Sequence, residues 1–94
     1  MVCLLQNHAE AFRLFDVARQ QDNIAGILGV AKMLLKGEGV ERDLDRSLEY
    51  MNAAANRGSA EALNGLGFMY HEGDVVPQNL TMAFDYFKVL ILHL

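Results

Sequence analysis

Hydrophobic and polar residues follow one another along this chain with the spacing of α-helices. In the segment 44–56, small and apolar residues recur at steps of three and four, which places them on one stripe of a helix. The residues of this stripe are Leu44, Ser47, Leu48, Met51, Ala54 and Ala55. The segment 24–36 is rich in Ala, Leu, Met and Lys, which are good helix formers. The pattern therefore predicts an amphipathic helix over 44–56 and a second helix over 24–36.

Capping residues mark where these two helices begin and end. Either Asp22 or Asn23 can cap the helix at 24–36, and Gly37 can adopt the left-handed conformation that ends it. Asp43 is the predicted N-cap of the helix at 44–56, and Gly58 follows its end. Both helices are thus bounded at each end by the residue types that stop helices.

The same signals predict three further helices. One is capped by Asn7 and runs to about Gln20. Another begins after Ser59 and ends near Gly73, and the last begins after Asn79. Five helices and no strand predict an all-α protein.

The helices recur with a fixed period. Sliding the sequence against itself by 36 residues pairs Gly29 with Gly65, Gly37 with Gly73, Leu44 with Leu80 and Tyr50 with Tyr86. Sliding it by 72 residues pairs Ala11 with Ala83, Phe12 with Phe84 and Phe15 with Phe87. A period of this length is typical of solenoids. We predict one domain over 1–94, a right-handed α-solenoid of about two and a half stacked helical hairpins. It comprises a partial repeat at 1–22 with the second helix only, a full repeat at 23–58, and a full repeat with an atypical end at 59–94.

Two glycines fall inside predicted helices. Gly29 and Gly65 each cost about 1 kcal/mol relative to alanine at such positions, so we expect a packing gain that offsets this cost. Ala31 and Gly67 lie two positions further on. Small residues there would allow a neighbouring helix to approach closely.

These motifs resemble those of the Sel-1-like repeat family, a branch of the tetratricopeptide-type solenoids. Residues 66–73, Leu-Gly-Phe-Met-Tyr-His-Glu-Gly, are similar to the first half of the family pattern. Residues 37–43 resemble its loop, and residues 54–58 resemble its end. Val75 replaces the loop's second glycine, and Leu90 and Ile91 stand where the family has Ala-Ala. The resemblance implies a non-catalytic scaffold that binds other proteins.

The run 70–87 is also similar to repeats of adaptors that serve ubiquitin ligases in endoplasmic-reticulum-associated degradation of misfolded proteins. This narrower resemblance implies an adaptor in the endoplasmic reticulum lumen. One alternative is a bacterial repeat protein that acts in envelope signalling or host interaction. A second alternative is a hydrolase built on the same repeats, which would need a pocket where a nucleophile and a base converge.

In solenoids of this type the first helix of each pair lines the concave surface. The resemblance therefore implies the candidate protein-binding residues Lys32, Lys36, Asn64, Phe68, His71 and Glu72. Each of them could instead belong to a solvated helix face. Core packing is the expected role of the aromatic residues Phe12, Phe15, Phe68, Tyr70, Phe84, Tyr86 and Phe87.

Charge and chemistry narrow the functional classes. The net charge of −4 supplies no surface for phosphate backbones, so we expect no nucleic-acid partner. The soft metal ligands Cys3, His8, His71 and His93 do not pair at zinc-site spacings, and no nucleophile accompanies His71 and Glu72. We expect no metal, no cofactor and no catalytic residue. The apolar run 89–92 is far shorter than the roughly 20 residues that span a bilayer, so we expect no direct membrane insertion.

Two further expectations concern the ends and a modification. The chain begins within a repeat loop and stops where another helix should dock. It is therefore expected to be a segment of a longer solenoid, a truncated isoform, or a chain that self-associates through its exposed repeat ends. Asn79-Leu80-Thr81 has the form of an N-glycosylation acceptor, but Asn79 is also placed as a helix N-cap.

Overall fold

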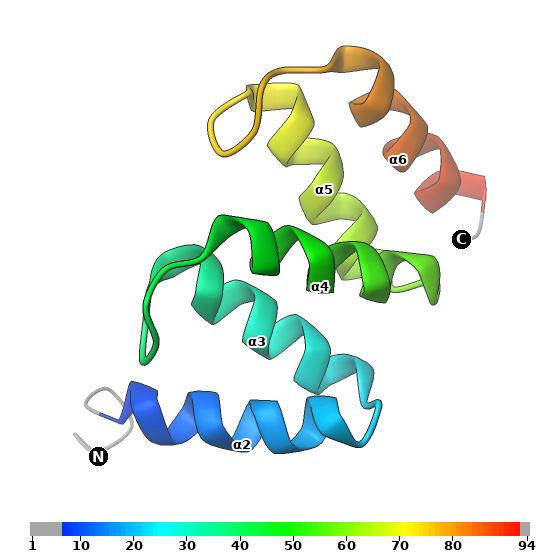
Figure 1. Ribbon diagram of the computed structural model, residues 1–94. Helices are drawn as coiled ribbons and strands as arrows, with labels where there is room; N and C mark the ends of the chain where they lie inside the picture. Colours follow the sequence, from blue (N-terminus) through cyan, green and yellow to red (C-terminus); the bar gives the residue numbers. More distant parts are fainter. Residues whose placement is uncertain (1–6, 93–94) are drawn as a thin grey trace. The chain divides into compact units, whose positions relative to one another are not determined.

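A computed structural model describes residues 7–92 of the chain. Over this range the chain forms five α-helices of 13 residues each and no strand (Figure 1). They are α2 (His8–Gln20), α3 (Ile24–Lys36), α4 (Leu44–Asn56), α5 (Ala60–Glu72) and α6 (Leu80–Leu92). The starts of α2, α4 and α6 are separated by steps of 36 residues, and so are those of α3 and α5. The predicted all-α class and the 36-residue period are confirmed.

The chain divides into two compact units, unit 1 (Met1–Ala54) and unit 2 (Ala55–Leu94). The boundary falls within the last turn of α4, so unit 1 contains α2, α3 and most of α4. Unit 2 contains the end of α4 together with α5 and α6. The predicted repeat boundaries at 22 and 58 stay a prediction.

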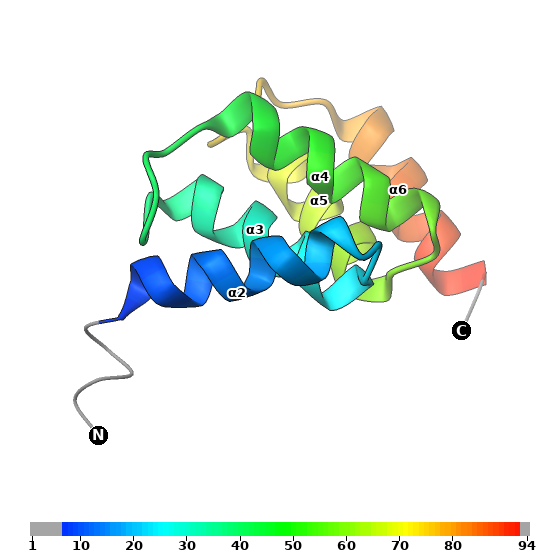
Figure 2. The same cartoon turned by 60° about the horizontal axis from the view of Figure 1, so that its bottom comes forward.

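In unit 1, α2 packs on α3 across a short turn (Figure 2). Asp22 takes the left-handed conformation in this turn, with φ of 64°. The Asn23 side chain then caps α3 by accepting a hydrogen bond from the backbone N–H of Gly26 at 3.0 Å. Asn7 occupies the N-cap position of α2 but makes no side-chain capping bond, so its predicted role as a hydrogen-bonding cap is wrong. Its backbone carbonyl accepts the first intrahelical bond of α2 instead.

The core of unit 1 is formed by apolar residues of α3 and α4. Val30, Ala31 and Leu34 of α3 are fully buried. Ser47 of α4 is buried among them, and its hydroxyl donates a hydrogen bond of 2.7 Å to the carbonyl oxygen of Ala31. Burial of the Ser47 hydroxyl without a hydrogen-bond partner would destabilise the fold, and this bond supplies the partner. It also joins α4 to α3 at mid-helix.

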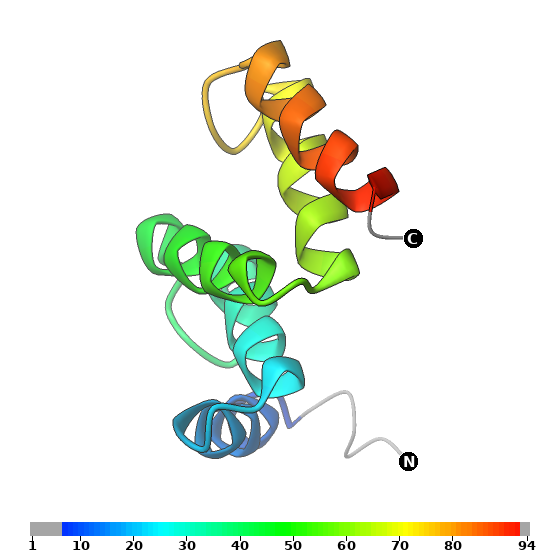
Figure 3. The same ribbon diagram turned by 90° about the vertical axis from the view of Figure 1, so that its right-hand side faces the viewer.

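In unit 2, α5 and α6 lie side by side as a hairpin (Figure 3). The Ser59 hydroxyl caps α5 by accepting a hydrogen bond from the N–H of Ala62 at 3.2 Å. α5 ends at Gly73, which has φ of 69°. The Asn79 side chain caps α6 by accepting from the N–H of Met82 at 3.1 Å. Each of these caps was predicted from the sequence.

The loops of the two hairpins, which join α3 to α4 and α5 to α6, close with the same hydrogen bonds. In the first loop the Arg42 side chain donates to the carbonyl of Leu35 at 3.1 Å. In the second the Gln78 side chain donates to the carbonyl of His71 at 2.8 Å. The N–H of the capping residue bonds to the preceding helix in both, from Asp43 to Leu34 at 3.0 Å and from Asn79 to Tyr70 at 2.9 Å. Equivalent positions of the repeat therefore adopt equivalent local structure.

Candidate protein-interaction site

The six candidate contact residues are all exposed. Lys32 and Lys36 lie one turn apart on α3 of unit 1. Asn64, Phe68, His71 and Glu72 lie on α5 of unit 2, at the spacing of one helix face. The structure thus brings four of the six together on one helix, and the other two together on another. Their role in binding stays a prediction.

Phe68 is the apolar member of the α5 face. Half of it is exposed (50%), and its ring meets the Phe87 ring of α6 edge to face, with 5.2 Å between centroids and 77° between planes. An exposed ring fixed by a second ring loses little conformational entropy when it binds a partner. Phe68 is therefore an exposed apolar side chain with a fixed ring on this face.

Several aromatic residues do not have the core role predicted for them. Phe84 is 65% exposed, and Phe15 is 39% exposed. The prediction of a core position is wrong for Phe84, and Phe15 and Phe68 are covered only in part. The periodic pattern placed these rings at apolar repeat positions, but the helix pairs of the described residues leave part of those positions uncovered.

Two glycines receive aromatic rings from the neighbouring helix. A Cβ atom at Gly29 of α3 would collide with the Phe15 ring of α2. A Cβ atom at Gly67 of α5 would lie 2.6 Å from Cε1 of Phe87 on α6. The close approach expected beside these small residues is present at Gly29 and at Gly67, and the packing gain expected at Gly29 and Gly65 stays a prediction.

In unit 1, arginine side chains cover the Tyr50 ring. The guanidinium carbon of Arg19, at the end of α2, lies 5.1 Å from the ring centroid, and that of Arg46 lies 5.8 Å from it. Both distances allow cation–π attraction. Arg19 is held in place by its Nε, which donates a hydrogen bond of 2.7 Å to Asp16. This bond also raises the pKa of Arg19, so the group stays cationic.

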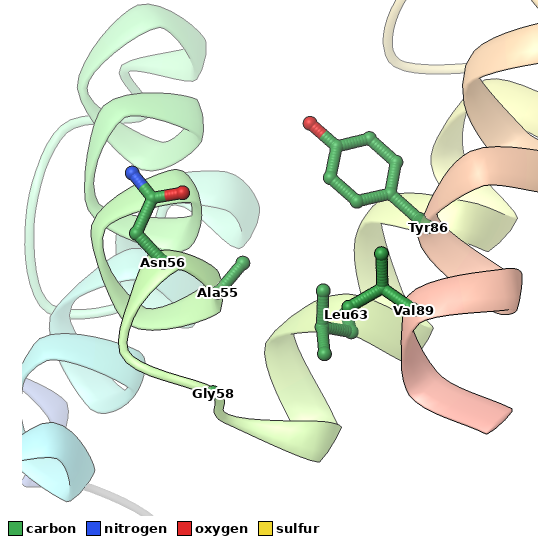
Figure 4. A pocket seen from close by; sticks show the side chains of 6 residues that line it. All are labelled: Ala55, Asn56, Gly58, Leu63, Tyr86 and Val89. Carbon is green, nitrogen blue, oxygen red and sulfur yellow. The ribbon is translucent and has the colours of Figure 1, made fainter. Parts of the chain in front are cut away.

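In unit 2, a pocket of about 420 Å³ lies beside the equivalent tyrosine, Tyr86 (Figure 4). Its lining residues are Ala55, Asn56, Gly58, Leu63, Tyr86 and Val89. The Tyr86 ring extends from α6 toward the end of α4, and Leu63 and Val89 line the pocket from α5 and α6. The walls are apolar except for the Asn56 carboxamide, the Tyr86 hydroxyl and backbone groups.

Tyr70 of α5 supports the ring that borders this pocket. The Tyr70 and Tyr86 rings are stacked, with 5.9 Å between centroids and 13° between planes. Burial is the main cause that raises the pKa of Tyr86, and the nearby Tyr70 raises it further to a smaller extent. Its hydroxyl is therefore neutral at physiological pH. Sequence reasoning missed the pocket, although one signal was present, since Ala55 occupies the repeat position at which unit 1 has Arg19.

Residues 7–92 contain no cluster of three or more His, Cys, Asp or Glu side chains that could hold a metal ion. Cys3 and His93 lie outside the described residues. No helix within that range is long and apolar enough to cross a membrane. The lining of the pocket includes no Ser, Cys, His, Asp, Glu or Lys side chain.

The helices are paired and recur every 36 residues, and the two hairpin loops repeat the same hydrogen bonds. These features define a helical repeat protein of the tetratricopeptide-like class. The family model "Sel1 repeat" matches residues 3–23, 25–59 and 60–89. The chain therefore belongs to the Sel1 repeat family, as its motifs implied. Its fold is typical of protein-interaction scaffolds that are not catalytic.

Two curated relatives come from Arabidopsis thaliana. The chain is 31% identical over 82 residues to the ERAD-associated E3 ubiquitin-protein ligase component HRD3B, and 32% identical over 82 residues to HRD3A. Each match covers 87% of this chain, but only 14% of HRD3B and 12% of HRD3A. The chain thus spans a small part of the length of these relatives.

Two solved structures share the fold. One is c5321, a protective antigen present in uropathogenic Escherichia coli strains and displaying an SLR fold. It is 26% identical, has a TM-score of 0.83, and is matched over 93% of this chain and 19% of its own. A Sel1 repeat protein from Oxalobacter formigenes is 23% identical with a TM-score of 0.76, over 84% of this chain and 59% of its own. These likenesses support the α-solenoid class of the fold.

Proposed function

We propose that this chain is part of a non-catalytic adaptor that acts in endoplasmic-reticulum-associated degradation of misfolded proteins. The similarity to HRD3A and HRD3B carries the proposal, because it extends over 87% of this chain and lies in ligase components associated with that process. Such an adaptor would work in the endoplasmic reticulum lumen. Rigid helix pairs suit the task, since a preformed surface loses little ordering entropy on binding.

Each unit offers a proposed contact face of its own, the exposed face of α3 in unit 1 and that of α5 in unit 2. Lys32 and Lys36 supply cations on α3, while Phe68 supplies an apolar anchor on α5 with Asn64, His71 and Glu72 beside it. A buried aromatic anchor surrounded by polar groups is the usual composition of an interface hot spot. We expect Phe68 to contribute most to binding among these residues.

An exchange experiment tests the adaptor role. The 82-residue matching segment of HRD3A is replaced by this chain in plants that lack HRD3A and HRD3B, and the half-life of a misfolded lumenal protein is measured. We expect the chimera to restore degradation and its Phe68→Ala variant to restore it less. Asp74→Asn, an exposed change in the loop between α5 and α6 and outside the proposed helix faces, is the matched control. A chimera that is stable and abundant but leaves the misfolded protein long-lived would overturn the adaptor role.

The second candidate is a bacterial repeat protein in envelope signalling or host interaction. The similarity to the protective antigen c5321, over 93% of this chain, favours it. Its sequence identity of 26% is lower than that to the plant ligase components, so we place it second. A hydrolase on the same repeats has no comparable support, because the lining of the unit 2 pocket offers no nucleophile or base.

Self-association is part of the proposal because α2 and α6 expose large apolar side chains. They are Leu14, Phe15 and Val17 on α2, and Leu80, Phe84, Val89, Ile91 and Leu92 on α6. Several large apolar side chains exposed on one helix favour contact with another protein surface. We expect the chain to sediment as a dimer or larger species, and Phe84→Lys with Ile91→Lys to shift it toward the monomer. Sedimentation of the unaltered chain as a monomer at high concentration would contradict self-association.

A further inference from the structure

We propose that the pocket beside Tyr86 binds an arginine side chain of a protein partner. The proposal deepens the scaffold function and rests on it, since it names one chemical group that such a partner presents. It is carried by a comparison within the chain: the same repeat position that leaves a pocket in unit 2 is filled by an arginine in unit 1.

The two sites correspond residue by residue. Tyr50 and Tyr86 are separated by one 36-residue period, and so are Arg19 and Ala55. In unit 1 the Arg19 side chain extends from the end of the second-type helix α2 onto the Tyr50 ring. In unit 2 the second-type helix α4 ends with Ala55 at this position, and Ala55 and Tyr86 line opposite parts of the pocket. The pocket therefore lies at the repeat position from which the Arg19 side chain reaches Tyr50 in unit 1.

The loss of the arginine is accompanied by other changes at the site. Arg46, the second cation on Tyr50, is replaced by Met82. Leu34 is replaced by Tyr70, whose ring stacks on Tyr86. The Tyr86 ring is thus fixed by Tyr70, and Ala55 and Met82 stand at the repeat positions of Arg19 and Arg46.

The surroundings of the pocket suit a guanidinium group. A planar cation can lie on the Tyr86 ring, as Arg19 does on Tyr50. The Asn56 carboxamide oxygen and the backbone around Gly58 offer neutral acceptors for its N–H groups. Leu63 and Val89 suit the methylene groups of the arginine stem. Unit 2 also carries more acidic than basic side chains, which favours a cation; they are Glu61, Glu72, Asp74 and Asp85 against Arg57 and Lys88.

A peptide titration followed by NMR tests this assignment. The isotope-labelled full chain is titrated with acetyl-Gly-Arg-Gly-amide, and in parallel with acetyl-Gly-citrulline-Gly-amide, which has nearly the same shape but no charge. We expect saturable shifts centred on Gly58, Tyr86 and Val89, and an affinity for the citrulline peptide that is about two- to fivefold lower. Equal affinity for the two peptides, the absence of shifts, or shifts spread over the acidic side chains would overturn the proposal.

Two kinds of variant localise the site. Ala55→Arg restores the arginine of unit 1, so we expect it to fill the pocket and abolish the peptide shifts. Tyr86→Phe keeps the ring and should retain binding, whereas Tyr86→Leu should weaken it about two- to fivefold. Tyr50→Leu, at the equivalent position in unit 1, is the matched control and should leave the affinity unchanged. Unaltered peptide binding by a folded Ala55→Arg variant would refute the site, even if Tyr86→Leu failed to fold.

Failure of the pocket can be distinguished from failure of the adaptor role. If the exchange chimera supports degradation but the peptides do not bind, only the arginine site is refuted. If the peptides bind at Tyr86 but the chimera fails, the adaptor role is refuted and the binding site remains.

Discussion

The hairpins α3–α4 and α5–α6 share their bounds, caps and loop hydrogen bonds, but they are packed with different side chains. The first places Ala31 opposite a helix that carries Ser47 and Met51, and the Ser47 hydroxyl bonds to Ala31. The equivalent residues of the second are Gly67, Ala83 and Phe87. The second hairpin therefore lacks the methyl group of Ala31 and the hydroxyl of Ser47, and the Phe87 ring lies against Gly67.

This difference shows how a repeat can change its interior without changing its backbone. Loss of volume at Gly67 and Ala83 is offset by a gain of volume at Phe87, as close-packed interiors require. The aromatic version also supports further rings, because Phe68 contacts Phe87 and Tyr70 stacks on Tyr86. The second hairpin therefore presents an aromatic surface and a pocket, while the Tyr50 ring of the first is covered by Arg46 of the same hairpin and by Arg19 of α2.

The largest loss of stability is expected at a position where the α3–α4 loop differs from the α5–α6 loop. Gly39 has φ of 75°, and a Cβ atom there would collide with the backbone carbonyl of His8. Its equivalent is Val75, and among the described residues Asp22 is the one non-glycine with positive φ. We expect Gly39→Val to lower the free energy of unfolding by about 2 kcal/mol or more, since both strain and collision oppose it. Denaturant unfolding followed by circular dichroism measures this loss.

The matched control for that change is Val75→Gly in the second loop. It should cost only about 1 kcal/mol, through added freedom of the unfolded chain and lost side-chain contacts. Equal losses for the two substitutions would mean that the loops are under the same backbone constraint, which contradicts the geometry.

The second effect concerns the exchange of volume between α5 and α6. Gly67→Ala places a Cβ 2.6 Å from the Phe87 ring, so we expect a net loss of about 1–2 kcal/mol, despite the better helix propensity of alanine. Adding Phe87→Met recreates the pair found in the first hairpin and should restore more than half of that loss. A double-mutant cycle of unfolding free energies measures the coupling. Simple additivity of the two changes would show that Gly67 and Phe87 do not compensate for each other.

The helix caps provide a third test, because Asp43 and Asn79 cap equivalent helices through the same bond. Asp43→Ala and Asn79→Ala should each cost about 1 kcal/mol. Asn79→Asp keeps the cap but removes the glycosylation acceptor, and so does Thr81→Ala. Mass measurement before and after glycosidase treatment of protein from a secretory host detects the glycan. A mass loss confined to the unaltered chain would establish the glycan, whereas an unmodified chain from that host would show that Asn79 serves only as a cap.

The smallest effect is a pH dependence carried by Tyr86. Burial raises its pKa above the ordinary value of 10.0, so the folded state favours the protonated phenol. This contribution to stability is complete below pH 10.0 and is lost as the pH rises through the raised pKa of the folded state. Free energies of unfolding measured from about pH 8 to about pH 11 should therefore fall more steeply for the unaltered chain than for Tyr86→Phe. Parallel curves for the two proteins would contradict the shift.

Much of the fold could be predicted because it depends on local signals. Asn23, Ser59 and Gly73 act at the helix ends through bonds to residues a few positions away, so their roles follow from the neighbouring sequence. The 36-residue period then assigns each helix to a place in the repeat. The candidate face on α5 came instead from the resemblance to the Sel-1-like repeat family, and its residues are exposed on α5.

What the sequence by itself determined is thus the set of helices, their ends and their family. Only the tertiary structure decided which side chain fills each space between the helices. The contact of Phe87 with Gly67, the exposure of Phe84 and the pocket beside Tyr86 depend on side chains from separate helices. Local patterns carry no information about these volumes, because packing is decided by the fit between surfaces that meet only in the folded chain.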